Sequence, residues 1–411
     1  MSKYNIVLIT VDSWNRNFVG CFNDKAREEN LTPHLNKFSE QCVVFPSAFS
    51  GSVKTSVSVL SILSGCCPCK YGDWYSSISA NRTMISEILR NHGYKTYGFT
   101  SNPCTSSLRN YDRGYDIFVD DNVLKNVDGI VLKMMLFFKT FFKNPYSSAD
   151  IINKQVLYHL KHESPYFINI HYMDLHGPYI SRKGSQFINR ISSGKLWNKA
   201  IVSPEKISIQ EKENMIAVYK DQMNFLDYHL GELIEKIDND NTMIIITGDH
   251  ADVFGDRGYF GHPFMFYNEM INVPLLVKLP AASIIRRRVC EQPVSLMDIV
   301  PTMIDIAGIN AHEKFDGNSL LPLIQNNDRE HKTKYIISEI SRKHASVIRG
   351  NWKLIADFER SSLELYDWVG DAGEQKNLSE TRPDIRHELE QVLRFHIINN
   401  KIDYVTDGSV L

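Results

Sequence analysis

Long apolar stretches are absent from this chain of 411 residues. No run of about 18 or more apolar residues occurs, so we expect no membrane-spanning helix. An excess of one charge is also absent, because 46 Lys and Arg balance 48 Asp and Glu to a formal net charge of −2. A nearly neutral chain gives no electrostatic reason to expect a nucleic-acid partner.

Cysteines are few and unevenly placed. The chain has 7, an odd number, and Cys66, Cys67 and Cys69 crowd into one short stretch. Neither fact suits a disulfide framework. The first residues, Met1 to Tyr4, lead directly into the apolar segment 5–11 and leave no space for a signal peptide before folded structure begins. We therefore expect a cytoplasmic protein.

Short apolar segments rich in β-branched residues alternate with helical patterns along most of the chain. With 43% hydrophobic and 23% charged residues, the composition is that of a globular protein with a large core. Alternating strands and helices predict an α/β fold whose central sheet is mainly parallel and flanked by helices. The segments that carry this pattern are strands at 5–11, 94–100, 166–172 and 243–247, and helices at 211–236 and 294–307.

Polar residues follow each of the predicted strands. Asp12 follows the first strand and Asn102 the second, while His176 follows the third and the pair Asp249-His250 the fourth. In parallel sheets, ligands bind beyond the carboxyl ends of the strands. These side chains are therefore predicted to share one site.

The pattern changes after about residue 330. Residues 349–355 and 363–366 read as short strands, and 383–398 reads as a charged amphipathic helix. We therefore predict an α/β domain over 1–330 that holds the site. A C-terminal subdomain over 331–411 would consist of a small antiparallel sheet and a terminal helix.

One segment has an unusual composition. Residues 131–143 are strongly apolar and contain three lysines. A helix packed on the core with its lysine head groups in solvent has this composition. A peripheral membrane contact or a lid over an apolar substrate has it too.

A family resemblance becomes visible at residues 55–65, Thr-Ser-Val-Ser-Val-Leu-Ser-Ile-Leu-Ser-Gly. This stretch resembles the sulfatase motif Cys-x-Pro-Ser-Arg-x-x-Leu-Leu-Thr-Gly, without its Cys, Pro and Arg. Residues 32–38, 294–302 and 350–367 resemble further sulfatase segments in the same order. The resemblance implies the fold of the alkaline phosphatase superfamily. It also places Thr55 where the family has the Cys that is oxidised to formylglycine, a conversion that a threonine cannot undergo.

A second stretch has the spacing of the formylglycine motif. Cys66-Cys67-Pro68-Cys69-Lys70 places Lys at the position of the Arg. It follows Gly65, however, and so falls in the register of the loop after the nucleophile helix. We therefore do not expect Cys66 to be modified.

The resemblance implies a divalent metal site. Its ligands would be Asp12, Thr55, Asp249 and His250, with Ser13 in place of the second acid that many sulfatases carry. Carboxylates, an imidazole and a hydroxyl make a plausible four-ligand set. Fewer acids favour Zn²⁺ or Mn²⁺, with Ca²⁺ or Mg²⁺ as alternatives.

Four more residues are candidates for contact with the substrate. His176, in a segment that resembles the family's His-x-Pro-Tyr, would act as general acid or bind the transferred group, and its alternative is a loop histidine packed by Tyr179. His262 is a candidate anion ligand, near the position of a sulfate-binding lysine of the family. Lys54 would lower the pKa of Thr55 or contact the anion, unless it is simply exposed. Asn102 is a further candidate.

Threonine at position 55 points away from ordinary sulfatase chemistry. Formylglycine hydrate releases its sulfate by collapsing to the aldehyde, and a threonine sulfate has no such exit. Threonine enzymes of the superfamily include phosphoethanolamine and phosphoglycerol transferases and phosphodiesterases. The prediction is a metal-dependent hydrolase or transferase of phosphate esters, mono- or diester, with a covalent intermediate on Thr55. Its anionic ester substrate could be carried on a glycan or a lipid.

Two other functions remain open. One is a true sulfatase that uses an unmodified hydroxyl. The other is a relative without catalytic activity that binds an anionic glycan or lipid, favoured by the missing Arg and by Ser13.

Overall fold

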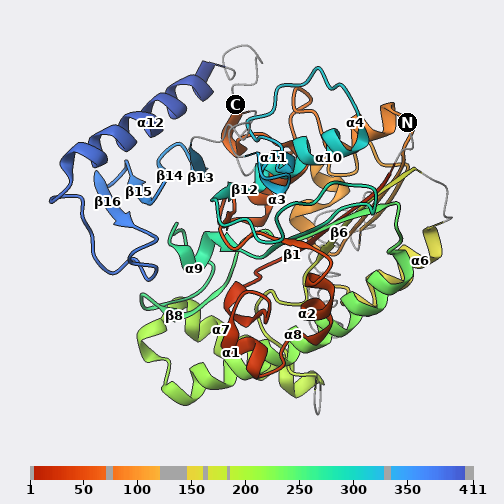
Figure 1. Cartoon of the computed structure of the whole chain (residues 1–411). Helices are drawn as coiled ribbons and strands as arrows, with labels where there is room; N and C mark the ends of the chain where they lie inside the picture. Colours follow the sequence, from red (N-terminus) through yellow and green to blue (C-terminus); the bar gives the residue numbers. More distant parts are fainter. Residues whose placement is uncertain are drawn as a thin grey trace.

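The computed structural model of the protein describes residues 4–70, 77–120, 146–160, 165–182, 186–327 and 335–402 (Figure 1). A seven-stranded sheet lies at its centre, in the order β2-β11-β7-β1-β6-β4-β5. Strands β7, β1, β6, β4 and β5 pair in parallel, and at one edge β11 pairs antiparallel with both β7 and β2. The predicted α/β fold with a mainly parallel central sheet is confirmed. The strands of this sheet are β1 (Asn5–Val11), β2 (Val43–Val44), β4 (Lys95–Thr100), β5 (Ile117–Asp120), β6 (Tyr166–Tyr172), β7 (Thr242–Gly248) and β11 (Leu275–Lys278).

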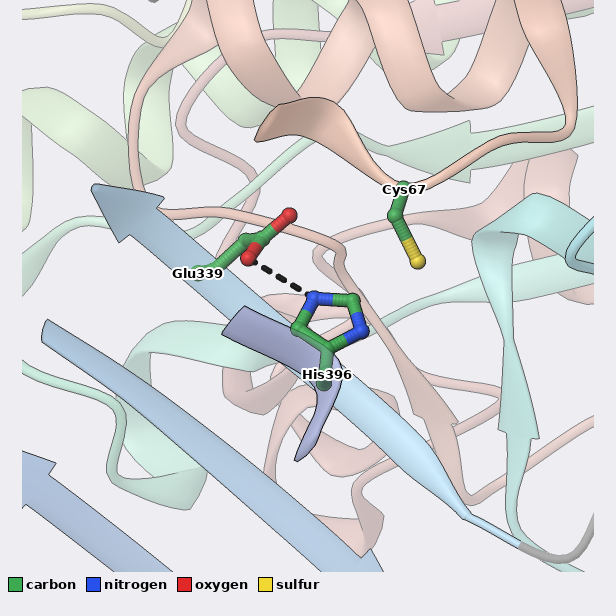
Figure 2. A group of neighbouring side chains, drawn as sticks. All are labelled: Cys67, Glu339 and His396. Carbon is green, nitrogen blue, oxygen red and sulfur yellow. Dashed lines mark hydrogen bonds and ion pairs between the residues drawn. The ribbon is translucent and has the colours of Figure 1, made fainter. Parts of the chain in front are cut away.

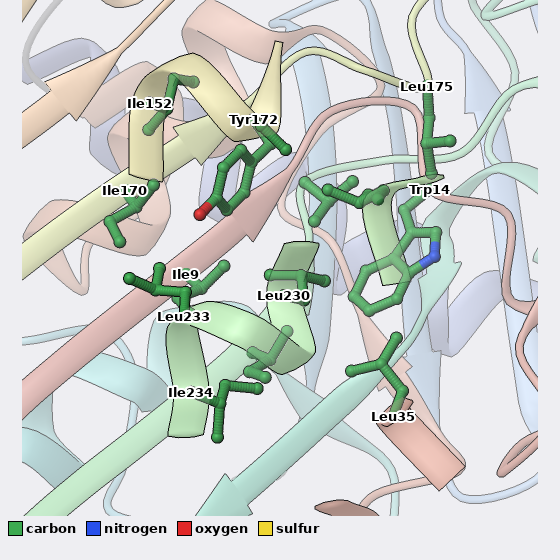
Figure 3. Close-up of a cluster of buried hydrophobic side chains, with 14 of the residues drawn as sticks. Ile9, Trp14, Leu35, Ile152, Ile170, Tyr172, Leu175, Leu230, Leu233 and Ile234 are labelled. Carbon is green, nitrogen blue, oxygen red and sulfur yellow. The ribbon is translucent and has the colours of Figure 1, made fainter. Parts of the chain in front are cut away.

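The central strands are buried on both faces, as the apolar segments predicted. Alternate residues of β1 enter different cores: Ile9 joins one cluster, and Leu8 the other. Figure 3 shows Ile9 against Leu230 and Leu233, which belong to the long helix α8. Helices therefore cover both faces of the sheet and bury its apolar side chains. The helices are α1 (Asp24–Glu28), α2 (Pro33–Ser39), α3 (Thr55–Ser64), α4 (Ile85–Asn91), α6 (Ala149–His159), α7 (Gln186–Val202), α8 (Ile209–Ile237), α9 (Asn268–Ile271), α10 (Ile299–Ala307), α11 (Leu321–Ile324) and α12 (Pro383–Ile402).

The helix predicted at 294–307 begins later than expected. Val294 and Ser295 form the short strand β12, which pairs in parallel with β3 (Ala48–Phe49). A 3-10 turn over Leu296–Asp298 follows, and α10 starts at Ile299. The carboxylate of Asp298 accepts the backbone N–H of Ser295 at 2.9 Å and closes this turn. Helical periodicity alone does not reveal such a strand pairing, because the partner β3 is remote in sequence.

The last part of the described chain forms the predicted antiparallel sheet and terminal helix. The strands β13 (Ile336–Ser341), β14 (His344–Arg349), β15 (Trp352–Asp357) and β16 (Ser362–Asp367) pair in order. Leu389 and Leu393 of α12 pack on this sheet (Figure 1). The remaining elements are β8 (Val253–Asp256), β9 (Tyr259–Gly261), β10 (Asn272–Val273) and 3-10 turns at Arg16–Phe18, Pro68–Lys70, Pro103–Thr105, Ser107–Arg109 and Pro204–Lys206.

Two predictions fall outside the described residues. The segment 131–143 is one, and the domain boundary between 330 and 331 is the other. Among the helices that the structure describes, none has the length and apolar composition needed to cross a membrane.

Candidate active site

The carboxyl ends of four neighbouring strands bring the predicted residues together. Asp12 lies at the end of β1, between β7, which leads to Asp249 and His250, and β6, which leads to His176. Asn102 follows β4, the next strand in the sheet. The side chains of Asp12, Asp249 and His250 are fully buried. The site is therefore formed where the parallel strands end, as the sequence predicted.

Thr55 is the first residue of α3. The helix starts here because Lys54 is extended at the N-cap, and it ends at Gly65, which has a left-handed backbone with φ of 63°. Thr55 Oγ1 lies 3.1 Å from Asp12 Oδ2 and 3.2 Å from His250 Nε2. This position at a helix N-terminus puts the hydroxyl in the positive end of the helix dipole.

Asp12 is the centre of the polar network. Its Oδ2 accepts a hydrogen bond of 2.8 Å from the amide of Asn102, and its Oδ1 accepts one of 3.0 Å from Ser13 Oγ. Burial alone would raise the pKa of Asp12, but the charges of His176 and His250 and the hydrogen bond of His171 lower it well below its usual range. The low pKa means that Asp12 is ionised in this site.

The pKa of Asp249 is shifted in the opposite direction from that of Asp12. Burial and the charge of Asp12 raise its pKa well above the usual range. Its Oδ1 accepts backbone N–H groups of His250 at 2.7 Å and of Ser13 at 3.2 Å, and its Oδ2 accepts from Ser58 Oγ at 3.2 Å. Ser13, which replaces an acid of the family, thus connects the two carboxylates through its backbone and its hydroxyl.

His171 is a site residue that the sequence analysis missed. Its Nδ1 lies 2.7 Å from Thr10 Oγ1, which also lies 3.2 Å from the carbonyl oxygen of Ile170. The contact with Thr10 orients the ring, and the tautomer determines whether Nδ1 or Nε2 carries the proton. This Nε2 faces Asp12 Oδ2 at 3.4 Å. The signal in the sequence was a polar residue inside an otherwise apolar strand.

The donor set fits a divalent cation. Two carboxyl groups and an imidazole nitrogen lie close together in a buried site, where a proton or a cation between them offsets the repulsion of the acids. The ligand atoms of Asp12, His171 and Asp249 lie within 4.8 Å of one another, and Thr55 and His250 adjoin them. Oxygen and imidazole donors of this kind suit Zn²⁺ or Mn²⁺.

Two half-buried histidines flank this buried group. The ring of His262 lies 4.9 Å from that of His250 and 5.2 Å from that of His176, measured between centroids. His262 Nδ1 is 2.8 Å from Oδ1 of Asp252, and the other carboxylate oxygen accepts from Tyr179 at 2.6 Å. Burial would raise the pKa of Asp252, but the charge and hydrogen bond of His262 lower it. The sequence analysis missed Asp252, although it stands only two positions after His250.

The other two candidates have local partners. Lys54 Nζ lies 5.0 Å from the centre of the Phe264 ring, and burial lowers the pKa of this lysine. The Asn102 amide donates to Asp12, and its carbonyl oxygen accepts the backbone N–H of Cys104 at 2.7 Å. The structure therefore shows Asn102 in support of Asp12, and its contact with a substrate stays a prediction.

The comparison with known families identifies the family to which the chain belongs. The family model described as Sulfatase matches residues 4–309. The chain belongs to the sulfatase family. A second model, for the C-terminal region of N-sulphoglucosamine sulphohydrolase, matches residues 255–399. Sulfatases generally bind a divalent metal ion, which agrees with the donor set at the ends of the strands.

Curated relatives of this sulfatase-family chain are named as sulfatases. Human arylsulfatase K is 25% identical over 451 aligned positions, which cover 96% of the chain and 82% of the relative. Mouse arylsulfatase K is 32% identical over 46% of the chain, and this match spans only 37% of the relative. The ulvan-active sulfatase of Formosa agariphila is 22% identical over 83% of the chain and 68% of the relative.

Solved structures share the fold over nearly the full length. A phosphonate monoester hydrolase from Silicibacter pomeroyi has a TM-score of 0.74 at 16% identity, with 97% of this chain and 96% of that chain covered. A 2-O GAG sulfatase has the same TM-score of 0.74 at 18% identity, with 98% and 94% covered. At such identities the likeness shows the fold alone.

Proposed function

We propose that this sulfatase-family chain is a metal-dependent hydrolase or transferase of anionic esters, with phosphate esters as its first substrate class and Thr55 as its nucleophile. The observation that carries the proposal is the position of Thr55 Oγ1, 3.1 Å from Asp12 Oδ2 and 3.2 Å from His250 Nε2 at the start of α3. A threonine hydroxyl in such a position replaces the family's formylglycine without a modification.

Asp12, Thr55, Asp249 and His250 would hold the cation, with His171 beside them. The cation supplies positive charge that stabilises a deprotonated oxygen on Thr55. The hydroxyl of Thr55 donates toward Asp12 Oδ2, so this carboxylate is placed to receive the proton that Thr55 loses. The amides at the start of α3 add positive potential around the transferred group.

The two flanking histidines, His176 and His262, would act on the oxygen atoms of the ester. His176 Nδ1 lies 2.6 Å from the carbonyl oxygen of Gly177, and a carbonyl only accepts, so Nδ1 carries a proton and Nε2 is directed elsewhere. In the first step the Thr55 oxygen bonds to phosphorus, the bond to the leaving oxygen breaks, and a protonated His176 gives that oxygen a proton. In the second step water or an acceptor hydroxyl attacks the phosphothreonine and gives its proton to His176, while the bond from phosphorus to the Thr55 oxygen breaks and that oxygen takes back the proton held by Asp12. His262, held by Asp252, is placed to donate to a non-bridging oxygen.

Sulfate esters form the second candidate class. The relatives named arylsulfatase K and ulvan-active sulfatase favour it, and they point to a glycan as the carrier of the ester. The chemistry of Thr55 favours phosphate, because a threonine sulfate cannot be released by collapse to an aldehyde. The third candidate function is binding without catalysis, in which the chain would keep the fold and the metal and hold the anion without turning it over.

Hydrolysis of an aryl phosphate monoester, an aryl phosphodiester and an aryl sulfate tests the proposal, with Mn²⁺ or Zn²⁺ supplied. The Thr55→Ala variant should lose activity by at least about 1,000-fold, and Thr55→Ser should keep a measurable part. Ser56→Ala is the matched control, because Ser56 is the next residue of α3 and is outside the proposed ligand set. It should keep normal activity.

The phosphothreonine intermediate gives a second readout. Acid quenching during turnover should yield a phosphate adduct on the peptide that contains Thr55. Turnover of the aryl sulfate alone would replace the phosphate proposal with the sulfate one. Equal activity of wild type and Thr55→Ala would refute the role of Thr55.

A further inference from the structure

Three side chains of metal-binding type meet outside the group of residues described at the candidate active site. Cys67 lies in the loop after α3, Glu339 in β13 of the C-terminal sheet, and His396 in α12. Figure 2 shows the three side chains directed toward a common point between these segments. Their ligand atoms lie within 4.8 Å of one another.

The cluster is buried rather than spread over the surface. Cys67 is 7% exposed and Glu339 is 1% exposed. The side chain of His396 is 12% exposed. Its Nε2 is 2.9 Å from Glu339 Oε2. A thiol, an imidazole and a carboxylate in such a setting are the donors of a zinc site, and adventitious surface groups seldom combine them.

Backbone groups hold two of the three donors in place. The backbone N–H of Cys69 donates to Glu339 Oε1 at 2.9 Å, which leaves Oε2 directed at His396. The backbone N–H of Cys67 donates to Asp316 Oδ2 at 2.8 Å, which fixes the chain that carries the thiol. Outer hydrogen bonds of this type orient the ligands of metal sites.

We propose that Cys67, Glu339 and His396 bind a Zn²⁺ ion, as a second metal site distinct from the one at Thr55. Zinc bonds of about 2.3 Å to sulfur and about 2.0 Å to nitrogen or oxygen place ligand atoms roughly 3.5 Å apart in a tetrahedron. The ligand atoms of Glu339 and His396, now 2.9 Å apart, would separate slightly, and the sulfur of Cys67 would approach them by roughly 1 Å. A fourth position stays available to water or a further protein group.

The ion would connect the loop after the nucleophile helix to the C-terminal sheet and to α12. Burial raises the pKa of the Cys67 thiol well above its usual range, and the nearby acids Asp316 and Glu339 raise it further. The thiol is therefore neutral until a cation arrives. On binding, a zinc–sulfur bond forms as the S–H bond breaks, and the proton passes to solvent.

Cobalt substitution distinguishes the two metal sites. Cobalt bound to a thiolate gives a charge-transfer absorption in the near ultraviolet, and the site at Thr55 contains no sulfur donor among its ligands. Titration of the reduced, metal-free full chain with Co²⁺ should produce this band, and in Asp249→Asn, where the site at Thr55 is weakened, the band should be complete at about one equivalent of metal. The band should persist in Asp249→Asn, so failure of the Thr55 proposal and failure of this one are separate outcomes.

Variants of the cluster make the assignment specific. Cys67→Ser should abolish the band. His396→Gln should weaken cobalt binding at least about 10-fold, while its amide still donates to Glu339 and preserves the link to α12. Cys21→Ser is the control, since it removes a half-buried thiol elsewhere. No band in the wild type, or a band that survives in Cys67→Ser, would show that the cluster is an ion pair beside a thiol and would overturn the proposal.

Discussion

Replacing Asp249 with Asn should change stability in opposite directions with and without a divalent cation. Asp249 and Asp12 have carboxylate oxygens within 4.8 Å in a fully buried site. Two unit charges at about 4.8 Å repel by about 3.5 kcal/mol at an effective dielectric constant of about 20. Without a cation, a proton on Asp249 removes part of this cost. We therefore expect Asp249→Asn to stabilise the metal-free protein by about 1 to 3 kcal/mol.

The local hydrogen bonds allow this substitution. Oδ1 of the asparagine can still accept the backbone N–H groups of Ser13 and His250. Its Nδ2 can donate to Ser58 Oγ, which is free to direct its own hydrogen to the carbonyl of Thr55 at 3.4 Å. The amide has no negative charge, however, and is a poor ligand for a divalent cation.

Urea unfolding in chelator and in excess Mn²⁺ measures both effects, because Mn²⁺ prefers oxygen and nitrogen ligands over the thiol at Cys67. The wild type should gain about 2.7 kcal/mol at a cation concentration of 100 times Kd, and Asp249→Asn should gain far less. Asp305→Asn is the control for net charge, because Asp305 is exposed on α10. The reasoning is refuted if Asp249→Asn is the less stable protein in chelator and the cation stabilises both proteins equally.

Three further predictions concern buried charges. Lys353 and Glu374 form a fully buried ion pair at 2.8 Å, so Lys353→Met should cost about 3 to 5 kcal/mol in urea unfolding. The double variant with Glu374→Gln should recover part of that loss, and additive losses would contradict the pairing. Burial raises the pKa of Asp174 to about 6. The folded state then holds this proton more tightly than the unfolded state, so stability should fall by at most about 3 kcal/mol as pH rises from about 4 to about 6. Asp174→Asn should flatten this slope, and an unchanged slope would rule out Asp174 as its source. Asp252→Asn should lower turnover by about 10-fold or more while the far-ultraviolet circular dichroism stays normal, because His262 loses the charge that orients it. Normal turnover would show that His262 does not need this partner.

The sequence by itself determined the strand order along the chain and the polar residues that end each strand. Short β-branched segments such as 5–11 and 243–247 have few alternatives to a buried strand, and β1 and β7 lie where they were predicted. Parallel strands also bring their carboxyl ends to one edge, so the proximity of Asp12, Asp249 and His250 follows from local patterns. The register with the sulfatase motif matched Thr55 to the family's nucleophile, and the structure showed that it begins α3.

Only the tertiary structure decided the contacts between remote segments. His171 faces Asp12 because β6 pairs with β1 in a register that no local pattern encodes. The pairing of β12 with β3 likewise shortened the helix predicted at 294–307. Cys67 and His396 come from opposite ends of the chain and meet because α12 packs across the C-terminal sheet. Periodicity acts over a few residues, while such contacts depend on how whole layers pack, and this is why they were found only in the folded molecule.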